Sequence, residues 1–298
     1  MSFLNFGSLN LDVVYQVPRI ATTGETVAAK SVDVFPGGKG LNQSIALARA
    51  GAEVFHAGLV GEDGGILEEA LRESGVDIRY LNRTKTRTGN AVIQVDETGR
   101  NSIVLFGGAN RENSLEYIEE TLSHFHEGDC LVLQNEVNLL DELIDRAYEK
   151  GMSIALNPSP YNGLLDRCRL DKVDLFLLNE VECRQMTGEK TPEEGLDALC
   201  ESYPRAEFVL TLGEEGAFFG ATRQSVFCPA LPVEAIDTTG AGDTFTGYFL
   251  AAYWGKGLSA ERSLQTATVG AALSVTRKGA AGAIPTREEV LTAYRQWI

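Results

Sequence analysis

The chain has 298 residues, a hydrophobic fraction of 44% and a formal net charge of −16. This length and composition suit one large α/β domain with a sizeable buried core. The excess of acidic residues argues against a nucleic acid partner, no apolar run is long enough to predict a membrane span, and residues 1–5 lack the pattern of a secretory signal.

The first polar segment, residues 7–12, follows a strand-like opening of the chain. On an extended backbone Asn10 and Asp12 point to the same side. An amide and a carboxylate placed together in this way hold the hydroxyls of a neutral polyol well. Taken alone, the segment also has the composition of an ordinary turn.

Strand-like stretches without intervening helices come in two pairs, at 13–17 with 26–35 and at 91–95 with 102–106. The second pair flanks a turn at 96–99 and predicts a hairpin. Such strands do not fit inside a parallel sheet, so they predict a small separate sheet drawn from about 11–35 and 89–106, unless they are plain edge strands. This sheet would be a lid over a site. Exposed strand edges commonly find partners, so the lid is also the predicted contact of a homodimer.

A glycine-rich segment at 37–43 precedes a predicted helix at 44–50, which Gly51 terminates. A Gly-Lys pair without a following Ser or Thr is not a Walker phosphate loop. The glycines allow backbone to approach a ligand closely, while Lys39 and Asn42 offer donors to hydroxyls, as a polyol site requires. A tight strand-to-helix turn is the alternative interpretation.

Strand-like and helix-like segments then alternate along most of the chain. The strands are predicted at 131–134, 153–156, 175–178 and 208–211. Asn138 is predicted to cap a helix that Gly151 ends, Thr191 precedes a helix with Pro at its first position, and Thr286 and Glu289 have capping-box spacing. The alternation predicts a single three-layer α/β/α domain over 1–298, with a mostly parallel sheet between helices.

The five cysteines are odd in number and none shows CxxC spacing. They predict neither a disulfide framework nor a zinc site, and they favour a reducing compartment such as the cytoplasm.

The strongest signal is the segment 237–245, which opens an apolar helix that runs to about Trp254. Glycines at a helix N-terminus leave N–H groups free to approach an anion, and the helix dipole favours negative charge there. Asp243, on the first turn, has the position of the acid that takes the hydroxyl proton in phosphoryl transfer. A Gly-rich turn whose Asp only caps the helix is the alternative.

The segments at 237–245 and 37–43 resemble the C-terminal and N-terminal signatures of the ribokinase-like carbohydrate kinases, the family that includes the minor phosphofructokinases. The resemblance extends from Gly7 to about Arg287. It implies a ribokinase-like fold with a small β-sheet lid. It also implies MgATP-dependent phosphorylation of a sugar primary hydroxyl, with D-ribose giving D-ribose 5-phosphate as the first expectation. Asp243 would be the catalytic base, next to an anion hole at Gly240, Ala241 and Gly242.

The resemblance also implies the remaining site residues. The sugar would be bound by Asn10, Asp12, Gly38, Lys39, Gly40, Asn42, Glu136 and Asp243. ATP would be bound by Asn179, Thr211, Gly213, Glu214, Gly216, Gly242 and Thr268. Glu182 would place magnesium through water, although helix capping explains the same Asn-x-x-Glu motif.

A potassium-like ion is the last ligand that the resemblance implies. Its ligands, mostly backbone carbonyls, would come from Asp237, Thr239, Ser274, Arg277, Gly279 and Ala283. Coordination that is rich in carbonyls and low in charge suits a large monovalent cation. An ordinary basic loop is the alternative.

Rival functions come from three classes. A kinase of the same family acting on fructose, a nucleoside or a sugar acid is the nearest, because Leu41, Ser44 and Asn110 depart from the family wording. A nicotinamide-dependent dehydrogenase would need a Gly-x-Gly-x-x-Gly segment after the first strand, and none follows. A non-catalytic sugar-binding regulator is disfavoured by the intact Asp243 and the glycines before it.

Overall fold

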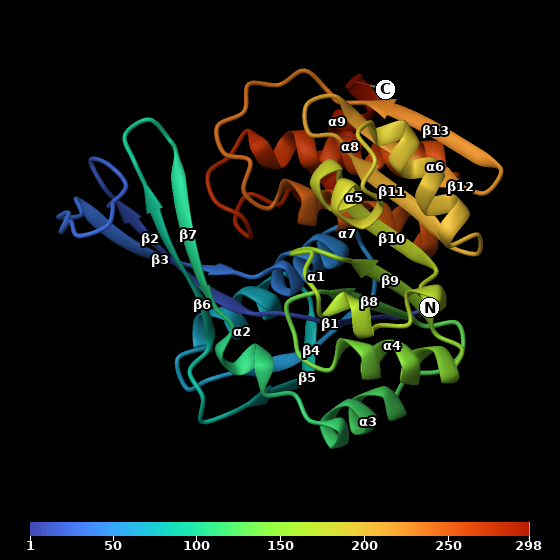
Figure 1. Ribbon diagram of the computed structural model, residues 1–298, viewed down its shortest axis with the longest axis horizontal. Coiled ribbons are helices and arrows are strands. Elements are labelled where there is room, and N and C mark those ends of the chain that lie inside the picture. The colour runs from blue at the N-terminus through green and yellow to red at the C-terminus, as the bar shows by residue number, and fades with distance from the viewer. Residues whose placement is uncertain (298) are drawn as a thin grey trace.

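The structure is a computed structural model that describes residues 1–297, and it has helices on both faces of a central sheet (Figure 1). Ile298, the last residue of the predicted domain, lies outside the described residues. The strands of the central sheet are β1 (Phe3–Phe6), β4 (Val54–Val60), β5 (Asp77–Arg83), β8 (Cys130–Gln134), β9 (Ser153–Asn157), β10 (Leu175–Asn179), β11 (Glu207–Thr211), β12 (Gly216–Ala221) and β13 (Gln224–Pro229).

Within the described residues the strand order is β13-β12-β11-β10-β9-β8-β1-β4-β5. The pairings from β5 to β11 are parallel, and β12 and β13 add an antiparallel edge. The predicted mostly parallel sheet is therefore confirmed.

The helices divide between the two faces according to the core that they bury. On one face are α1 (Lys39–Arg49), α2 (Gly65–Glu73), α7 (Ala241–Lys256), α8 (Ala260–Val275) and α9 (Arg287–Trp297). On the other are α3 (Leu115–Ser123), α4 (Leu140–Glu149), α5 (Glu180–Thr187) and α6 (Pro192–Ser202). Side chains alternate between the two cores along each strand, so that in β11 Val209 joins the first core while Phe208 and Leu210 join the second.

Strand β1 lies where the order of connection reverses. The chain passes from β1 to β4 and β5 on one side, and it returns to β8 on the other side. The loops that follow β1 and β8 are thus neighbours at the carboxyl end of the sheet, which is where open α/β sheets bind ligands. Gly7 directly follows β1, and a Cβ there would clash with the side-chain oxygen of Gln134 and lie 2.7 Å from the Cα atom of Gly40. This crowding brings the start of α1 against the end of β1.

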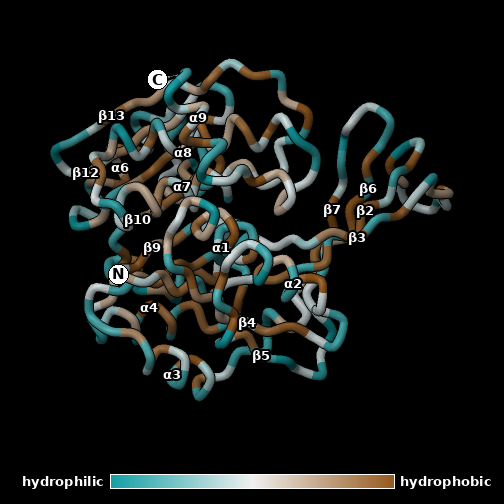
Figure 2. The backbone as a smooth tube through the Cα atoms, turned by 180° about the vertical axis from the view of Figure 1, so that it is seen from behind, coloured by the Kyte–Doolittle hydropathy of each residue, from teal (hydrophilic) through white to brown (hydrophobic). Residues whose placement is uncertain are grey.

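A second sheet projects from the body (Figure 1). It contains β2 (Asn10–Gln16), β3 (Ser31–Gly37), β6 (Gly89–Val95) and β7 (Asn101–Phe106), in the order β3-β2-β6-β7. The predicted small separate sheet and its hairpin are confirmed, although the strand expected within 26–35 begins only at Ser31. Hydrophobic residues run along β6 and β7 (Figure 2), and Ile103, Val104 and Phe106 are more than half exposed, at 56%, 66% and 53%.

Two local predictions are wrong. Asn138 does not cap α4: the cap is Leu139, in a left-handed conformation with φ 56°, because Asn138 instead bonds the backbone N–H and C=O of Asn113. Helix α1 begins at Lys39 and not at Ser44, because Gly38 makes the turn alone, with φ 95°, and lets the chain enter the helix at once.

The other capping predictions are confirmed. Thr191 caps α6 ahead of Pro192, and Thr286 and Glu289 bond each other's backbone N–H groups at the start of α9. Among the helices of residues 1–297, none combines the length and the apolar character needed to cross a membrane.

Candidate active site

Asp243 lies on the first turn of α7, and its side chain is buried. Its Oδ2 accepts a hydrogen bond from Nδ2 of Asn42 at 3.0 Å, and its Oδ1 accepts one from Nε2 of Gln43 at 2.9 Å. Burial raises the pKa of Asp243, while the charge of Lys39 and the two amide donors oppose that rise. A carboxylate in this balance is more basic than one in water, and each of its oxygens has an amide donor, which suits proton abstraction.

The N-terminus of α7 faces open space. Gly240 caps the helix in a left-handed conformation, with φ 73°, and a Cβ at Gly242 would meet no atom within 4 Å. The N–H of Ala241 donates to the carbonyl of Thr238 at 3.2 Å, so this member of the predicted anion hole already has an acceptor. The N–H groups of Gly242 and Asp243 belong to the first turn, which has no acceptor within the helix.

Carboxylates gather around Lys39 on the sugar side predicted from the sequence. Asp12 lies on β2, and burial, with repulsion from Glu136 and Asp243, raises its pKa to about 7. Burial alone would lower the pKa of Lys39, but attraction to Asp243, Glu136 and Glu182 outweighs it and raises that pKa. The fold therefore brings together the predicted sugar ligands that are most distant in sequence.

The predicted glycines of 37–40 allow this close packing. A Cβ at Gly37 would overlap the carboxylate of Asp12, and one at Gly38 would lie 2.9 Å from the backbone nitrogen of Asn10. These glycines therefore set strand β2 and the start of α1 in contact, and the Asp12 carboxylate lies directly over the backbone.

Glu136 follows β8 and is held by the loop after β1. Its Oε2 accepts hydrogen bonds from Oγ of Ser8 and, at 3.3 Å, from the backbone N–H of Lys39. The Ser8 oxygen in turn accepts from the N–H of Gly40 at 3.2 Å. The sequence did not single out Ser8, which lies within the predicted sugar segment.

Asn110 is a site residue that the sequence reasoning noted only as a departure from the family pattern. Its Nδ2 donates to Oδ1 of Asn10 at 2.8 Å and to the carbonyl of Leu9 at 3.1 Å, while its Oδ1 accepts from the N–H of Leu9 at 2.9 Å. The bond to Asn10 occupies the oxygen of that amide and leaves its NH₂ group to donate to a ligand.

A cleft of about 890 Å³ lies on the other side of the α7 N-terminus. The predicted ATP residues Thr211, Gly213, Glu214, Gly216, Gly242 and Thr268 all line it. So do residues that the sequence reasoning missed, among them Leu231, Pro232, Val233 and Phe245. Because Ala241 and Gly242 belong to this lining, a phosphate chain lying in the cleft would reach the start of the helix.

Asn179 does not line this cleft. Its side chain accepts from the N–H groups of Val181 and Glu182, at 2.8 Å and 3.0 Å, and Oε2 of Glu182 accepts from the N–H of Asn179 at 2.9 Å. The pair forms a capping box, so the capping alternative describes their contacts in this structure. Glu182 still acts electrostatically on Lys39 and contributes to its raised pKa.

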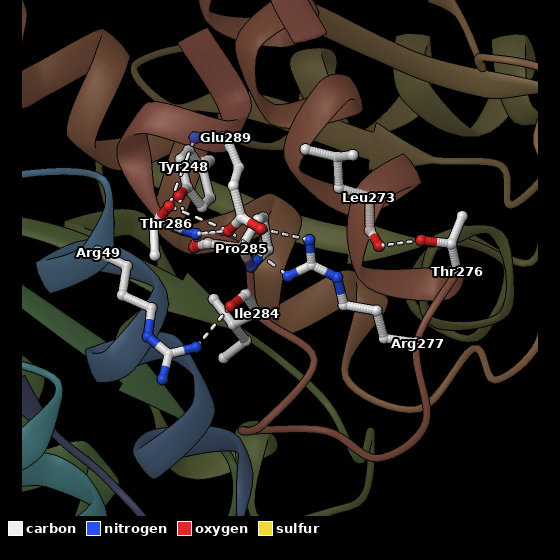
Figure 3. A network of polar contacts seen from close by, with 9 residues as sticks. All are labelled: Arg49, Tyr248, Leu273, Thr276, Arg277, Ile284, Pro285, Thr286 and Glu289. Carbon is white, nitrogen blue, oxygen red and sulfur yellow. Dashed lines mark hydrogen bonds and ion pairs between the residues drawn. The ribbon is translucent and has the colours of Figure 1, made fainter. Parts of the chain in front are cut away.

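The predicted potassium loop is folded around Asp237. Oδ2 of Asp237 accepts from the N–H of Gly279 at 2.8 Å, and Oδ1 accepts from the N–H and hydroxyl of Thr239 at 2.9 Å and 2.6 Å. The Arg277 side chain turns away to Glu289, at 2.5 Å (Figure 3). Only its backbone carbonyl can then serve an ion here. In residues 1–297 no group of three or more His, Cys, Asp or Glu residues is arranged to hold a metal ion.

Side chains from two helices hold this loop in place (Figure 3). Arg49, at the end of α1, donates to the carbonyl of Ile284 at 2.5 Å, and the Tyr248 hydroxyl of α7 donates to the carbonyl of Pro285 at 2.8 Å. Ala280 of the same loop packs near Gly240, where a Cβ would lie 3.0 Å from the Ala280 Cβ. The loop is thus part of the wall that supports the α7 N-terminus.

Comparisons with known proteins agree with this arrangement. A family model described as pfkB family carbohydrate kinase matches residues 2–287. A ribokinase of Haemophilus influenzae is 35% identical over 294 residues, which cover 96% of this chain and 95% of the relative. The crystal structure of Thermotoga maritima ribokinase has a TM-score of 0.89 at 32% identity and covers 99% of each chain. An Arabidopsis thaliana ribokinase complexed with ribose and ATP has a TM-score of 0.87 at 29% identity, covering 99% of this chain and 98% of its own.

Proposed function

The chain belongs to the pfkB family of carbohydrate kinases, and on that footing we propose that it transfers the γ-phosphoryl group of MgATP to the O5 hydroxyl of D-ribose. The observation that carries the proposal is the position of Asp243. Its buried carboxylate lies on the first turn of α7, between the sugar-side residues Lys39 and Asn42 and the cleft that Gly242 lines. Phosphoryl transfer needs an acid–base group at such a boundary.

The proposed sugar side combines hydrogen-bond acceptors and donors. The carboxylates of Asp12 and Glu136 would accept hydrogen bonds from sugar hydroxyls, and the amide of Asn10 would donate one. Oδ1 of Asn42 is buried and has no partner among the described residues. A sugar hydroxyl that donates to it would satisfy a group that otherwise costs stability. The Arabidopsis relative is complexed with ribose, which favours a pentose here.

In the reaction, Asp243 would take the proton of the O5 hydroxyl as that oxygen attacks the γ-phosphorus. The bond between the phosphorus and the β–γ bridging oxygen breaks, and ADP leaves with that electron pair. The N–H groups of Gly242 and Asp243 belong to the first turn of α7, and they would stabilise negative charge on the transferring group. The lid would exclude water from the site and so limit hydrolysis of ATP.

The residues present fit the two expected ions in different ways. Glu182 uses Oε2 in its capping box, which leaves its other carboxylate oxygen to hold a water of a magnesium ion. The Asp237-centred loop would supply backbone carbonyls to a potassium ion. Magnesium would neutralise phosphate charge, and potassium would stabilise the loop that packs against Gly240.

We also propose a homodimer through the lid and a reducing, cytoplasmic location. The lid exposes Val32, Ile103, Val104 and Phe106, at 53% to 66%, which is an apolar surface that commonly marks a protein contact. Its outer strands β3 and β7 also leave unpaired edges. All five cysteines are free, which suits a reducing compartment. A Val104→Asp variant that sediments at the mass of the wild type would contradict the dimer.

The decisive experiment measures ADP formation with D-ribose, 2-deoxy-D-ribose, D-fructose, nucleosides and a sugar acid, at constant ionic strength, with potassium or sodium. We expect D-ribose to give the highest kcat/KM and potassium to raise it. A higher kcat/KM for fructose or a nucleoside would overturn the substrate, and equal rates in both salts would overturn the ion site. Asp243→Asn serves as the matched inactive control.

A further inference from the structure

Behind Asp243 lies a chain of side-chain amides that the mechanism above does not use. Gln43 of α1, Gln134 of β8 and Asn5 of β1 are each completely buried. Nε2 of Gln134 donates to Oε1 of Gln43 at 2.8 Å and to Oδ1 of Asn5 at 3.0 Å. Nδ2 of Asn5 donates to the carbonyl of Gly40 at 2.9 Å. The chain therefore runs from a backbone carbonyl to the carboxylate of Asp243.

The two ends of this chain fix the orientation of every amide within it. A backbone carbonyl only accepts, so Asn5 must turn its NH₂ group to Gly40 and its oxygen to Gln134. Gln134 then donates to Gln43, whose oxygen is occupied and whose NH₂ group is left for Asp243. If the Gln134 amide were flipped, its oxygen would face the oxygens of both Gln43 and Asn5. The orientation described here is therefore the one in which every contact pairs a donor with an acceptor.

Packing alone does not explain these residue types. Oε1 of Gln134 is buried and has no hydrogen-bond partner among the described residues. An unpaired buried acceptor is unfavourable, and a methionine of similar size would fill the space without it. The polar residue is retained at a cost, which points to a task for its NH₂ group.

We propose that Gln43, held by Gln134 and Asn5, is a positioning residue that orients the Asp243 carboxylate and keeps it ionised. This inference rests on the proposed role of Asp243 as the base. Burial raises the pKa of Asp243, and the Gln43 donor is one of three groups that oppose the rise, with Lys39 and Asn42.

The charged groups that face Asp243 are Lys39 from α1 and Asp12 from β2, and Glu136 and Glu182 act in turn on Lys39. The test variants below leave all of them unchanged. A difference between these variants and the wild type therefore reports on the amide chain.

The test compares Gln43→Met and Gln134→Met with the wild type, by kcat at saturating ribose and MgATP from about pH 5 to about pH 9. Loss of the Gln43 donor should shift the acid limb of the profile of kcat against pH toward higher pH by about one unit. Above that limb kcat should reach a plateau that is lowered only by the lost orientation of the carboxylate, and the KM for ribose should stay within about twofold. Gln134→Met should move the limb in the same direction by less, because Gln43 remains but is free to rotate.

Ser44→Ala is the matched control. Ser44 is a completely buried neighbour on the same helix, but its hydroxyl bonds Nδ1 of His56 at 2.7 Å and does not touch the amide chain. It should leave the acid limb in place even where it lowers the melting temperature. The double variant of Gln43 and Gln134 should resemble Gln43→Met alone, because Gln134 acts through Gln43.

An acid limb that stays at the wild-type pH would overturn the proposal, even where kcat falls uniformly, because a residue that only packs against Asp243 would lower kcat without changing its ionisation. If Gln43→Met does not fold, Gln43→Asn keeps an amide that is one methylene too short to reach Asp243, and it carries the same expectation. Asp243→Asn separates the two proposals. If Asp243→Asn is inactive while the acid limb of Gln43→Met stays at the wild-type pH, the role proposed for the amide chain is wrong and the kinase mechanism stands. If Asp243→Asn turns over normally, the mechanism itself is wrong.

Discussion

The two sides of the Asp243 carboxylate are built differently. On the sugar side, buried hydrogen bonds determine where each polar group points: Asn110 sets Asn10, Ser8 sets Glu136, and Gln43 sets Asp243. On the proposed nucleotide side, a cleft of about 890 Å³ is lined largely by glycine, alanine and apolar residues. A site that must orient one hydroxyl for attack needs preset polar groups, whereas a site that holds a large flat ligand needs mainly shape. Substitutions on the sugar side should therefore affect the reaction more.

The largest effect expected from this contrast is at Asp243, which lies between the two sides. Asp243→Asn keeps the size of the side chain but removes the base, so kcat should fall by about 10²–10⁴-fold. The KM for ATP should change little, because Asp243 bonds to Asn42 and Gln43 and not to the cleft lining. Steady-state kinetics with ribose and ATP varied in turn measure both. A large rise in the KM for ATP would contradict the proposed division of the site into a sugar side and a nucleotide side.

A smaller effect should appear in the pH dependence on the sugar side. Burial and neighbouring acids raise the pKa of Asp12 to about 7. The ionised form is the hydroxyl acceptor, so kcat/KM for ribose should fall as pH drops through about 7, by about tenfold per unit below it. A profile of kcat/KM against pH checks this. Asp12→Asn should have a lower but flatter profile, and an equally steep fall in that variant would remove Asp12 as the cause.

The smallest effect is expected on the nucleotide side. Thr268 lines the cleft, and its hydroxyl lies 3.7 Å from the sulfur of Cys228. Thr268→Val keeps the shape and removes one weak polar contact, so the KM for ATP should rise by at most about fivefold, with kcat unchanged. Initial rates at varied ATP measure it. A loss of kcat as large as that of Asp243→Asn would mean that polar groups on the nucleotide side also orient the reacting atoms.

The sequence predicted the fold well because its signals are local. Buried parallel strands are continuous apolar runs, and Pro192 and the pair Thr286 and Glu289 mark helix starts by spacing alone. The glycine motifs located the residues around Asp243 for the same reason. Contacts between segments that are distant in the sequence could not be predicted from it. Asn5 and Gln134 are 129 positions apart and have no local pattern, and the left-handed Leu139 is set by tertiary contacts of its neighbour Asn138.

The base of the lid has a mechanical consequence. Asn10 pairs with Gly37 on one side and with Gly89 on the other, so three of the four strands of the small sheet, β2, β3 and β6, meet the body in one short row that includes a proposed sugar ligand. A swing of the lid about that row would carry Asn10 and Asp12, which both lie on β2, with it. Opening of the proposed sugar site and weakening of its hydrogen bonds to the product would then occur in one movement.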